Sequence, residues 1–106
     1  FRVRWSDTSN IAGGKRVLID IGLKGSQFSE AYLRKVAQRI RETYCNEIEI
    51  NAVIIDMSDR RKYDDLTPPP VYPPSTRALY FLDRTSGEER LQFYRDEKYG
   101  ATIELN

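Results

Sequence analysis

The sequence predicts an α+β fold, a two-layer sandwich in which one long amphipathic helix packs on a mixed β-sheet of four to six strands. Two patterns predict it. Residues 16–57 hold a strand pattern, a helix pattern and a second strand pattern in succession, which indicates a βαβ unit. Two later apolar segments flank a turn and are followed by a short alternating segment, which indicates a β-hairpin and a last strand.

The N-terminal segment is predicted to be a strand followed by a loop. Phe1, Val3 and Trp5 alternate with two arginines, and this period of two is typical of a half-buried strand. Residues 6–15 are mostly polar and contain two adjacent glycines, a composition typical of a loop or turn. Residues 16–24 alternate cleanly between an apolar and a mixed face, so they form the next predicted strand.

A helix is predicted to follow Gly25, with Ser26 or Ser29 as its N-cap and its end near Tyr44. Its apolar positions recur at spacings of three and four, so they form one stripe that must pack on another element; they are Leu33, Val36, Ala37, Ile40 and Tyr44. The β-branched segment 48–57 is the next predicted strand. The helix stripe is therefore expected to pack on the sheet as the crossover of the βαβ unit. An antiparallel arrangement of the two strands stays open, because a helix can also link strands that are not adjacent.

Residues 58–76 are predicted to form a long loop, because they are polar at first and then hold all five prolines of the chain. The prolines favour a stiff, extended polyproline II path. Beyond them, the apolar segments 77–82 and 89–95 flank a polar turn that contains Gly87, which predicts the hairpin. Residues 101–105 alternate and form the short last strand.

One helix covers one face of such a sheet, so the reverse face is expected to be available for docking. Leu18, the run 79–82 and Tyr94 indicate that this reverse face is not purely polar. We expect some of these side chains to lie under the proline-rich loop or in an interface.

The inventory of residue types excludes several classes of chemistry. The chain has no histidine, which excludes imidazole bases, Ser–His–Asp triads and most transition-metal sites. Cys45 is the only cysteine, so no intramolecular disulfide forms, and we expect a packed or half-buried thiol. The aspartates that follow the second strand of the βαβ unit are interspersed with basic residues, which indicates a solvated loop. Neither a metal ion nor a cofactor is predicted.

Length and charge narrow the function classes further. The 106 residues fit a single α+β domain over 1–106, and because the chain starts at Phe1 we expect a fragment or mature domain of a larger protein. A net charge of +1 is far from the strongly basic balance of a nucleic-acid module. The longest apolar stretches are strand-sized, so no membrane-spanning segment is predicted.

The proline-rich loop carries the most unusual motif. Residues 69–72 match the Pro-Pro-x-Tyr pattern that WW domains bind, and a stiff polyproline II segment loses little entropy on docking. We therefore predict a non-catalytic protein–protein interaction or assembly module, whose partner is another protein or a copy of itself. The predicted partner-binding residues combine this loop with aromatics of the hairpin: Pro69, Pro70, Val71, Tyr72, Tyr80 and Tyr94.

Two alternatives stay open. Lys24, Gly25 and Ser26 lie where a strand gives way to the helix, and backbone N–H groups there can hold a phosphate, as in a small enzyme or a nucleotide-binding domain. The outward face of the helix is basic and can contact RNA, although few aromatic side chains accompany it. The residues of this basic face are Arg34, Lys35, Arg39 and Arg41.

Overall fold

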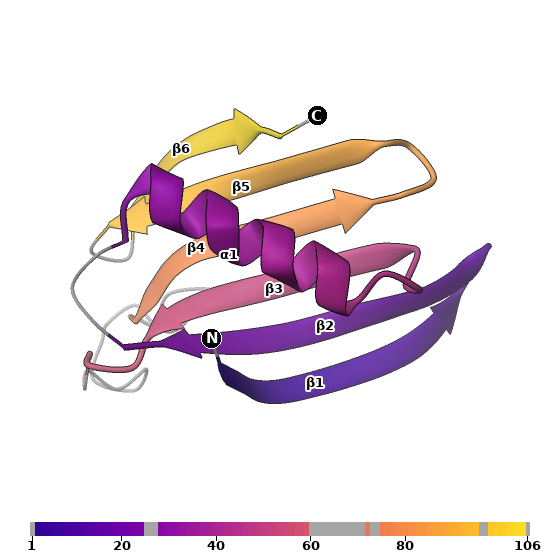
Figure 1. Ribbon diagram of the computed structural model, residues 1–106, viewed down its shortest axis with the longest axis horizontal. Coiled ribbons are helices and arrows are strands. Elements are labelled where there is room, and N and C mark those ends of the chain that lie inside the picture. Colours follow the sequence, from indigo (N-terminus) through magenta and orange to yellow (C-terminus); the bar gives the residue numbers. More distant parts are fainter. Residues whose placement is uncertain (1, 25–27, 60–71, 73–74, 96–97, 106) are drawn as a thin grey trace.

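The computed structural model describes residues 2–24, 28–59, 72, 75–95 and 98–105. These residues form six strands and one helix, in the order that Figure 1 shows. The elements are β1 (Arg2–Ile11), β2 (Gly14–Leu23), α1 (Glu30–Thr43), β3 (Glu49–Asp56), β4 (Thr76–Asp83), β5 (Glu88–Arg95) and β6 (Lys98–Glu104). The predicted α+β sandwich with one long helix, a hairpin and a short last strand is confirmed.

The six strands form one mixed sheet whose spatial order follows the chain, from β1 to β6 (Figure 1). Strands β2 and β3 are parallel and are joined through α1, as the βαβ pattern predicts, whereas every other neighbouring pair is antiparallel. The register aligns Val17 of β2 with Ile50 of β3, and Ile50 with Leu82 of β4. The apolar side chains of successive strands therefore share one face.

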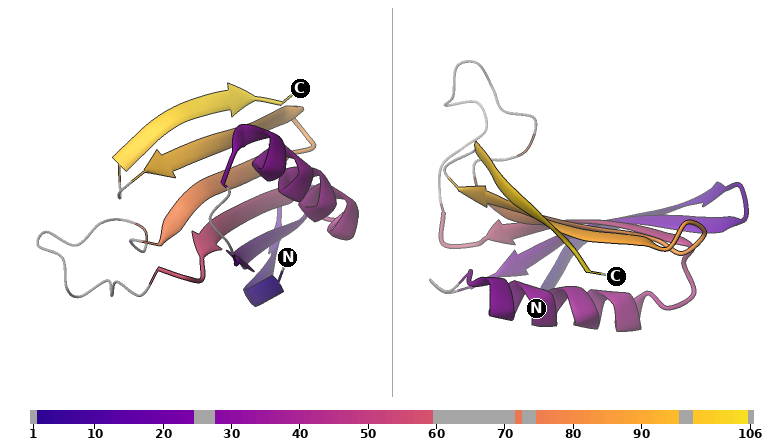
Figure 2. Two further views of the ribbon diagram at one scale, coloured as in Figure 1. Left: turned by 60° about the vertical axis from the view of Figure 1, so that its left-hand side comes forward. Right: turned by 90° about the horizontal axis from the view of Figure 1, so that it is seen from above.

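Helix α1 lies against that face and forms the second layer of the sandwich (Figure 2). Its stripe residues Leu33, Val36, Ala37 and Ile40 are between 0% and 4% exposed, so the spacing of the apolar positions predicted the packed side of the helix correctly. The helix begins at Glu30 because the Ser29 side chain accepts a hydrogen bond from the backbone N–H of Tyr32. At 14 residues, this helix of the described chain is too short and too polar to cross a membrane.

The prediction for residues 6–15 was wrong. They continue β1 as far as Ile11, and only Ala12 and Gly13 form the turn to β2. Gly13 has a φ of +91°, a conformation that costs glycine little, which permits so tight a turn. The polar residues remain extended because β2 offers them a continuous ladder of hydrogen-bonding groups. Strand β1 is not half-buried as predicted, since all its residues except Ile11 are exposed.

The face of the sheet opposite α1, called the open face below, carries no second layer among the described residues (Figure 2). Its centre is apolar and half-buried. The guanidinium of Arg90 lies 4.3 Å from the ring centre of Phe81, so a charged side chain covers part of this centre. The apolar residues at this centre include Leu18, Val53, Leu79 and Phe81.

One smaller expectation was also wrong. Cys45 is exposed and is not a packed or half-buried thiol, because it follows the last turn of α1 and lies outside the apolar stripe. Most of the predicted loop 58–76 lies outside the described residues, apart from its two ends and Tyr72.

Candidate functional site

A cleft of about 890 Å³ lies on the helix side of the sheet. It lies between the start of α1, the last two strands, and the ends of β3 and β4, and its volume is in the range of small-molecule and peptide sites. Its lining residues are Phe28, Glu30, Asp56, Ser58, Arg77, Phe93, Tyr94, Gly100, Ala101 and Ile103.

The wall of the cleft on the sheet side is apolar. Ala101 of β6 is paired with Phe93 of β5, and Ile103 is paired with the buried Leu91. Phe28, just before α1, packs against the edge of the hydrophobic core and closes the other side. The apolar wall therefore exists because β6 is aligned so that its alternate side chains face the helix layer.

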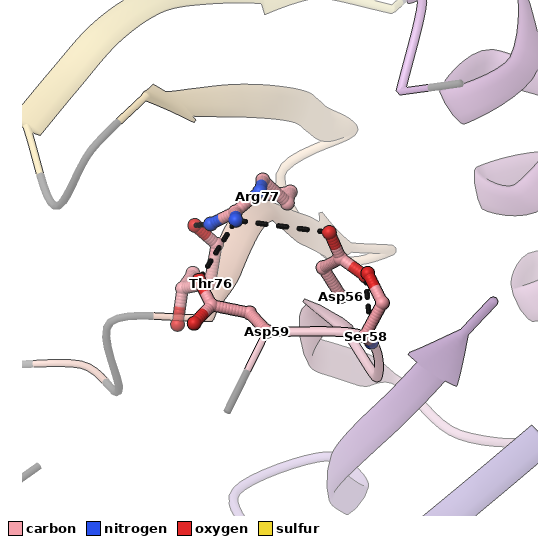
Figure 3. A network of polar contacts seen from close by, with 5 residues as sticks. All are labelled: Asp56, Ser58, Asp59, Thr76 and Arg77. Carbon is pink, nitrogen blue, oxygen red and sulfur yellow. Dashed lines mark hydrogen bonds and ion pairs between the residues drawn. The ribbon is translucent and has the colours of Figure 1, made fainter. Parts of the chain in front are cut away.

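The opposite end of the cleft is polar, and Figure 3 shows how its side chains converge. Oδ1 of Asp56 accepts hydrogen bonds from the backbone N–H of Ser58, at 2.9 Å, and from its hydroxyl, at 2.5 Å. Nη2 of Arg77 lies 2.9 Å from Oδ2 of Asp59 and 3.7 Å from Oδ2 of Asp56. One guanidinium thus holds the turn after β3 against the start of β4.

The described residues at this polar end include neither a Ser–His pair nor a cluster of metal ligands. The hydroxyl of Ser58 donates to a carboxylate, but the chain holds no histidine that could act as its base. The described residues contain no group of three or more histidine, cysteine or acidic side chains placed to hold a metal ion. The arrangement is suited to binding and orienting a ligand through charge-assisted hydrogen bonds.

Two of the predicted partner-binding residues meet beside this cleft. The rings of Tyr72 and Tyr94 have centroids 6.0 Å apart and planes inclined by 72°, an edge-to-face contact. Tyr94 also lines the cleft, so the contact joins the proline-rich segment to its wall. Pro69, Pro70 and Val71 lie outside the described residues.

Tyr80, also predicted to bind a partner, is instead part of the core. Its side chain is 1% exposed, because β4 is aligned so that Tyr80 lies opposite Ala52 on the helix side. The hydroxyl donates a hydrogen bond to Glu89, which satisfies its polar end. Tyr80 therefore offers no surface to a partner in this structure.

The residues of the two alternative sites lie apart from the cleft. Lys24 is exposed and borders a smaller cavity of about 310 Å³, while Gly25 and Ser26 lie outside the described residues. On the basic face, Arg34 is paired with Glu30 and Arg41 with Glu89. Lys35 and Arg39 are exposed on the same helix. The positive charges of Arg34 and Arg41 are thus engaged in ion pairs within the chain.

The cleft itself was not predicted from the sequence. The sequence predicts a solvated loop around Asp56 and Asp59, compensated by basic residues 60–62, which lie outside the described residues. The structure instead pairs Asp59 with Arg77 of β4, and the Asp59 side chain is only 8% exposed. No local signal marks Arg77 or Ile103 as neighbours of the helix start, because three separate strand pairings bring them there. A comparison of the chain with models of known protein families gives no match, and comparisons with curated proteins and with solved structures give none either.

Proposed function

We propose that this chain is a non-catalytic protein-interaction module that binds an extended segment of a partner protein along β6, with side chains of that segment in the cleft. The observation that supports this proposal is the position of β6. It is the last strand of the sheet and at the same time a wall of the cleft. One element therefore offers hydrogen-bonding backbone at its outer edge and a side-chain pocket next to it.

The geometry suits addition of a strand. Among the described residues, β6 has β5 as its only strand neighbour, so its outer backbone groups face away from the sheet. A segment that pairs with this edge lies about 4.8 Å beyond β6, and every second side chain points to the helix side. Those side chains enter the cleft between Ile103 and Phe28.

The lining predicts which side chains the partner presents. Phe93, Ala101 and Ile103 favour an apolar residue, while the carboxylate of Asp56 offers acceptors to a polar group nearby. Tyr72 and Tyr94 extend the contact area with rings that lose little conformational entropy on binding. Tyr72 of the proline-rich loop and Tyr94 of the hairpin thus remain partner-binding residues, and the centre of binding lies in the cleft.

A random peptide library displayed on phage, selected on the purified chain, tests the proposal. Enriched peptides are expected to alternate apolar and polar residues and to shift backbone amide NMR signals of β6 and of the first turn of α1. Selection without enrichment, or shifts confined to the open face, would contradict it.

Two matched variants of β6 distinguish a loss of binding in the cleft from a loss of stability of the fold. Ala101→Arg fills the cleft, whereas Thr102→Arg places the same side chain at the next position, paired with Gln92 and directed to the other face. We expect Ala101→Arg to weaken peptide binding by about tenfold or more, equivalent to ~1.4 kcal/mol, and Thr102→Arg to leave it within about twofold. Tyr72→Ala and Tyr94→Ala are expected to weaken it less than Ala101→Arg. Equal losses for Ala101→Arg and Thr102→Arg would count against the cleft.

A further inference from the structure

Strand β1, at the opposite edge of the sheet from β6, carries two of the three exposed large hydrophobic side chains of the described chain. Val3 is 38% exposed and Trp5 52%, and both belong to this strand. The register places them on different faces, because Val3 is paired with Ile21 on the helix side and Trp5 with Asp20 on the open face. A partner that covers both side chains must therefore lie along the edge and not on one face.

The edge itself is suited to strand pairing. Strand β1 has ten residues and no proline, and β2 is its only strand neighbour in the described part of the chain. Its one irregularity is a bulge between Val3 and Trp5. A long, exposed edge of this kind is a template for another strand, against which proteins ordinarily protect themselves.

We propose that two copies of this chain pair β1 against β1, antiparallel, about a two-fold axis through Ser6, so that their two sheets become one continuous sheet. This surface is independent of the cleft beside β6. A two-fold symmetric pair is the commonest form of homo-oligomer, and it requires a strand that complements itself. Strand β1 meets this requirement because it carries Arg2 and Arg4 in its first half and Asp7 in its second.

The alternation of side chains restricts the register, and charge favours the one centred on Ser6. Residues directly opposite one another in two paired strands must share a face. An axis between two neighbouring residues would pair side chains of opposite faces. The axis must therefore place one residue opposite the same residue of the second copy. With the axis at Ser6, Trp5 lies opposite Asp7 of the second copy on the open face. With the axis at Asp7, the two Asp7 carboxylates lie opposite each other and repel.

The bulge adds a charge pair to the register centred on Ser6. Arg4 also lies on the open face, since a Cβ atom placed on Gly22 would lie 2.9 Å from its Cδ. It therefore lies beside Trp5 and close to Asp7 of the second copy, and the symmetry repeats this pair of opposite charges. Because the bulge adds Arg4 as one extra residue, Val3 lies opposite Thr8 of the second copy. Both side chains lie on the helix side, so this pair also satisfies the rule that opposite residues share a face.

Disulfide trapping tests this pairing. In a Cys45→Ser background, which removes the exposed thiol, Ser6→Cys places two thiols directly opposite each other, with Cβ atoms about 4.5–5.5 Å apart. Ser9→Cys is the matched control on the same strand, because two such residues are about 20 Å apart across the axis. Mild oxidation is expected to convert most of the Ser6→Cys chain into a covalent dimer and little of the Ser9→Cys chain. Equal cross-linking of the two variants would overturn the register.

Sedimentation velocity measures the association without a cross-link. The unmodified chain is expected to reach twice the mass of one copy as its concentration rises. Asp7→Arg faces Arg4 of the second copy and is expected to raise the dissociation constant by about tenfold or more, while circular dichroism reports an unchanged fold. A chain that keeps the mass of one copy at every concentration would overturn the dimer. An unchanged dissociation constant for Asp7→Arg would overturn the pairing of these charges.

Discussion

The hydroxyl of Tyr80 donates a 2.5 Å hydrogen bond to Oε2 of Glu89 inside the hydrophobic core. Oε1 of the same carboxylate accepts a hydrogen bond of 3.0 Å from Nη1 of Arg41 on α1. Glu89 is 6% exposed, so its charge is compensated by a buried phenol on β4 and by a half-exposed guanidinium on the helix. This chain of three side chains joins the two layers of the sandwich.

Removing the phenol oxygen tests the strength of this connection. We expect Tyr80→Phe to lower the free energy of unfolding by about 1–3 kcal/mol, because it leaves a buried carboxylate oxygen without its donor. Tyr32→Phe is the control, since Tyr32 is 40% exposed on α1. Urea unfolding followed by circular dichroism measures both variants. The same free energy of unfolding for the two variants would contradict a structural role for the Tyr80 hydrogen bond.

Alkaline pH provides a second test of Tyr80. Burial, followed by the hydrogen bond to Glu89, raises the pKa of Tyr80 above the ordinary tyrosine value of 10.0. Above pH 10 the folded chain therefore keeps a proton that the unfolded chain releases, so the stability present below pH 10 is lost as the pH rises. In Tyr80→Phe, the free energy of unfolding is expected to fall less steeply above pH 10 than in the unmodified chain. Parallel pH profiles would contradict this prediction.

Arg84, in the turn between β4 and β5, forms hydrogen bonds with backbone carbonyls at and after the end of α1. Its Nε donates to the carbonyl of Glu47 at 2.8 Å, and Nη2 lies 3.3 Å from the carbonyls of Arg41 and Tyr44. We expect Arg84→Met to lower the free energy of unfolding by about 1.5–3 kcal/mol, and Arg84→Lys to restore only part of it, because an ammonium cannot reproduce the planar fork. Urea unfolding with Arg34→Met as the exposed control measures the difference. Full rescue by lysine would contradict the geometric argument.

The start of α1 depends on one hydroxyl. Ser29 accepts from the backbone N–H of Tyr32 at 3.2 Å, so Ser29→Ala is expected to lower the free energy of unfolding by about 1 kcal/mol. Ser29→Asp retains an acceptor and favours the helix dipole, and should therefore keep the stability of the unmodified chain. Thermal unfolding of the two variants checks the prediction. Equal losses would show that the side chain does not act as a cap.

Asp20 of β2 gives a prediction for acid pH. Burial on the open face raises its pKa above 3.8, although Arg4 opposes the shift. Protonation is therefore favoured in the folded chain, and the stability present below pH 3.8 is lost as the pH rises through the raised pKa. Asp20→Asn is expected to unfold at a higher urea concentration than the unmodified chain at neutral pH, with no such gain for Asp7→Asn on the exposed β1. A lower midpoint for Asp20→Asn would contradict this expectation.

Elements in which apolar residues recur at regular spacings could be predicted from the sequence. Which strands form the edges of the sheet, and which side chains of β4 face the helix, could not. The stripe from Leu33 to Ile40 allows only one packed side, so the position of α1 on the sheet followed from spacing alone. Residues 78–82 are different, because both alternating sets are apolar. Periodicity could not decide whether Tyr80 or Phe81 faces the helix, and the pairing of Tyr80 with Ala52 decides it. Likewise, polar residues such as Ser9 became strand because β2 was available as a neighbour.

By itself, the sequence determined the two-layer α+β architecture, the packed face of α1 and the absence of imidazole chemistry. Each of these depends on residue types or on spacings within one element, which the chain order contains completely. Only the tertiary structure decided that Phe28, Arg77 and Ile103 surround one cleft and that β1 and β6 form the two edges. Those relationships depend on the registers of five strand pairs, and a register is set by packing between segments that are distant in the chain.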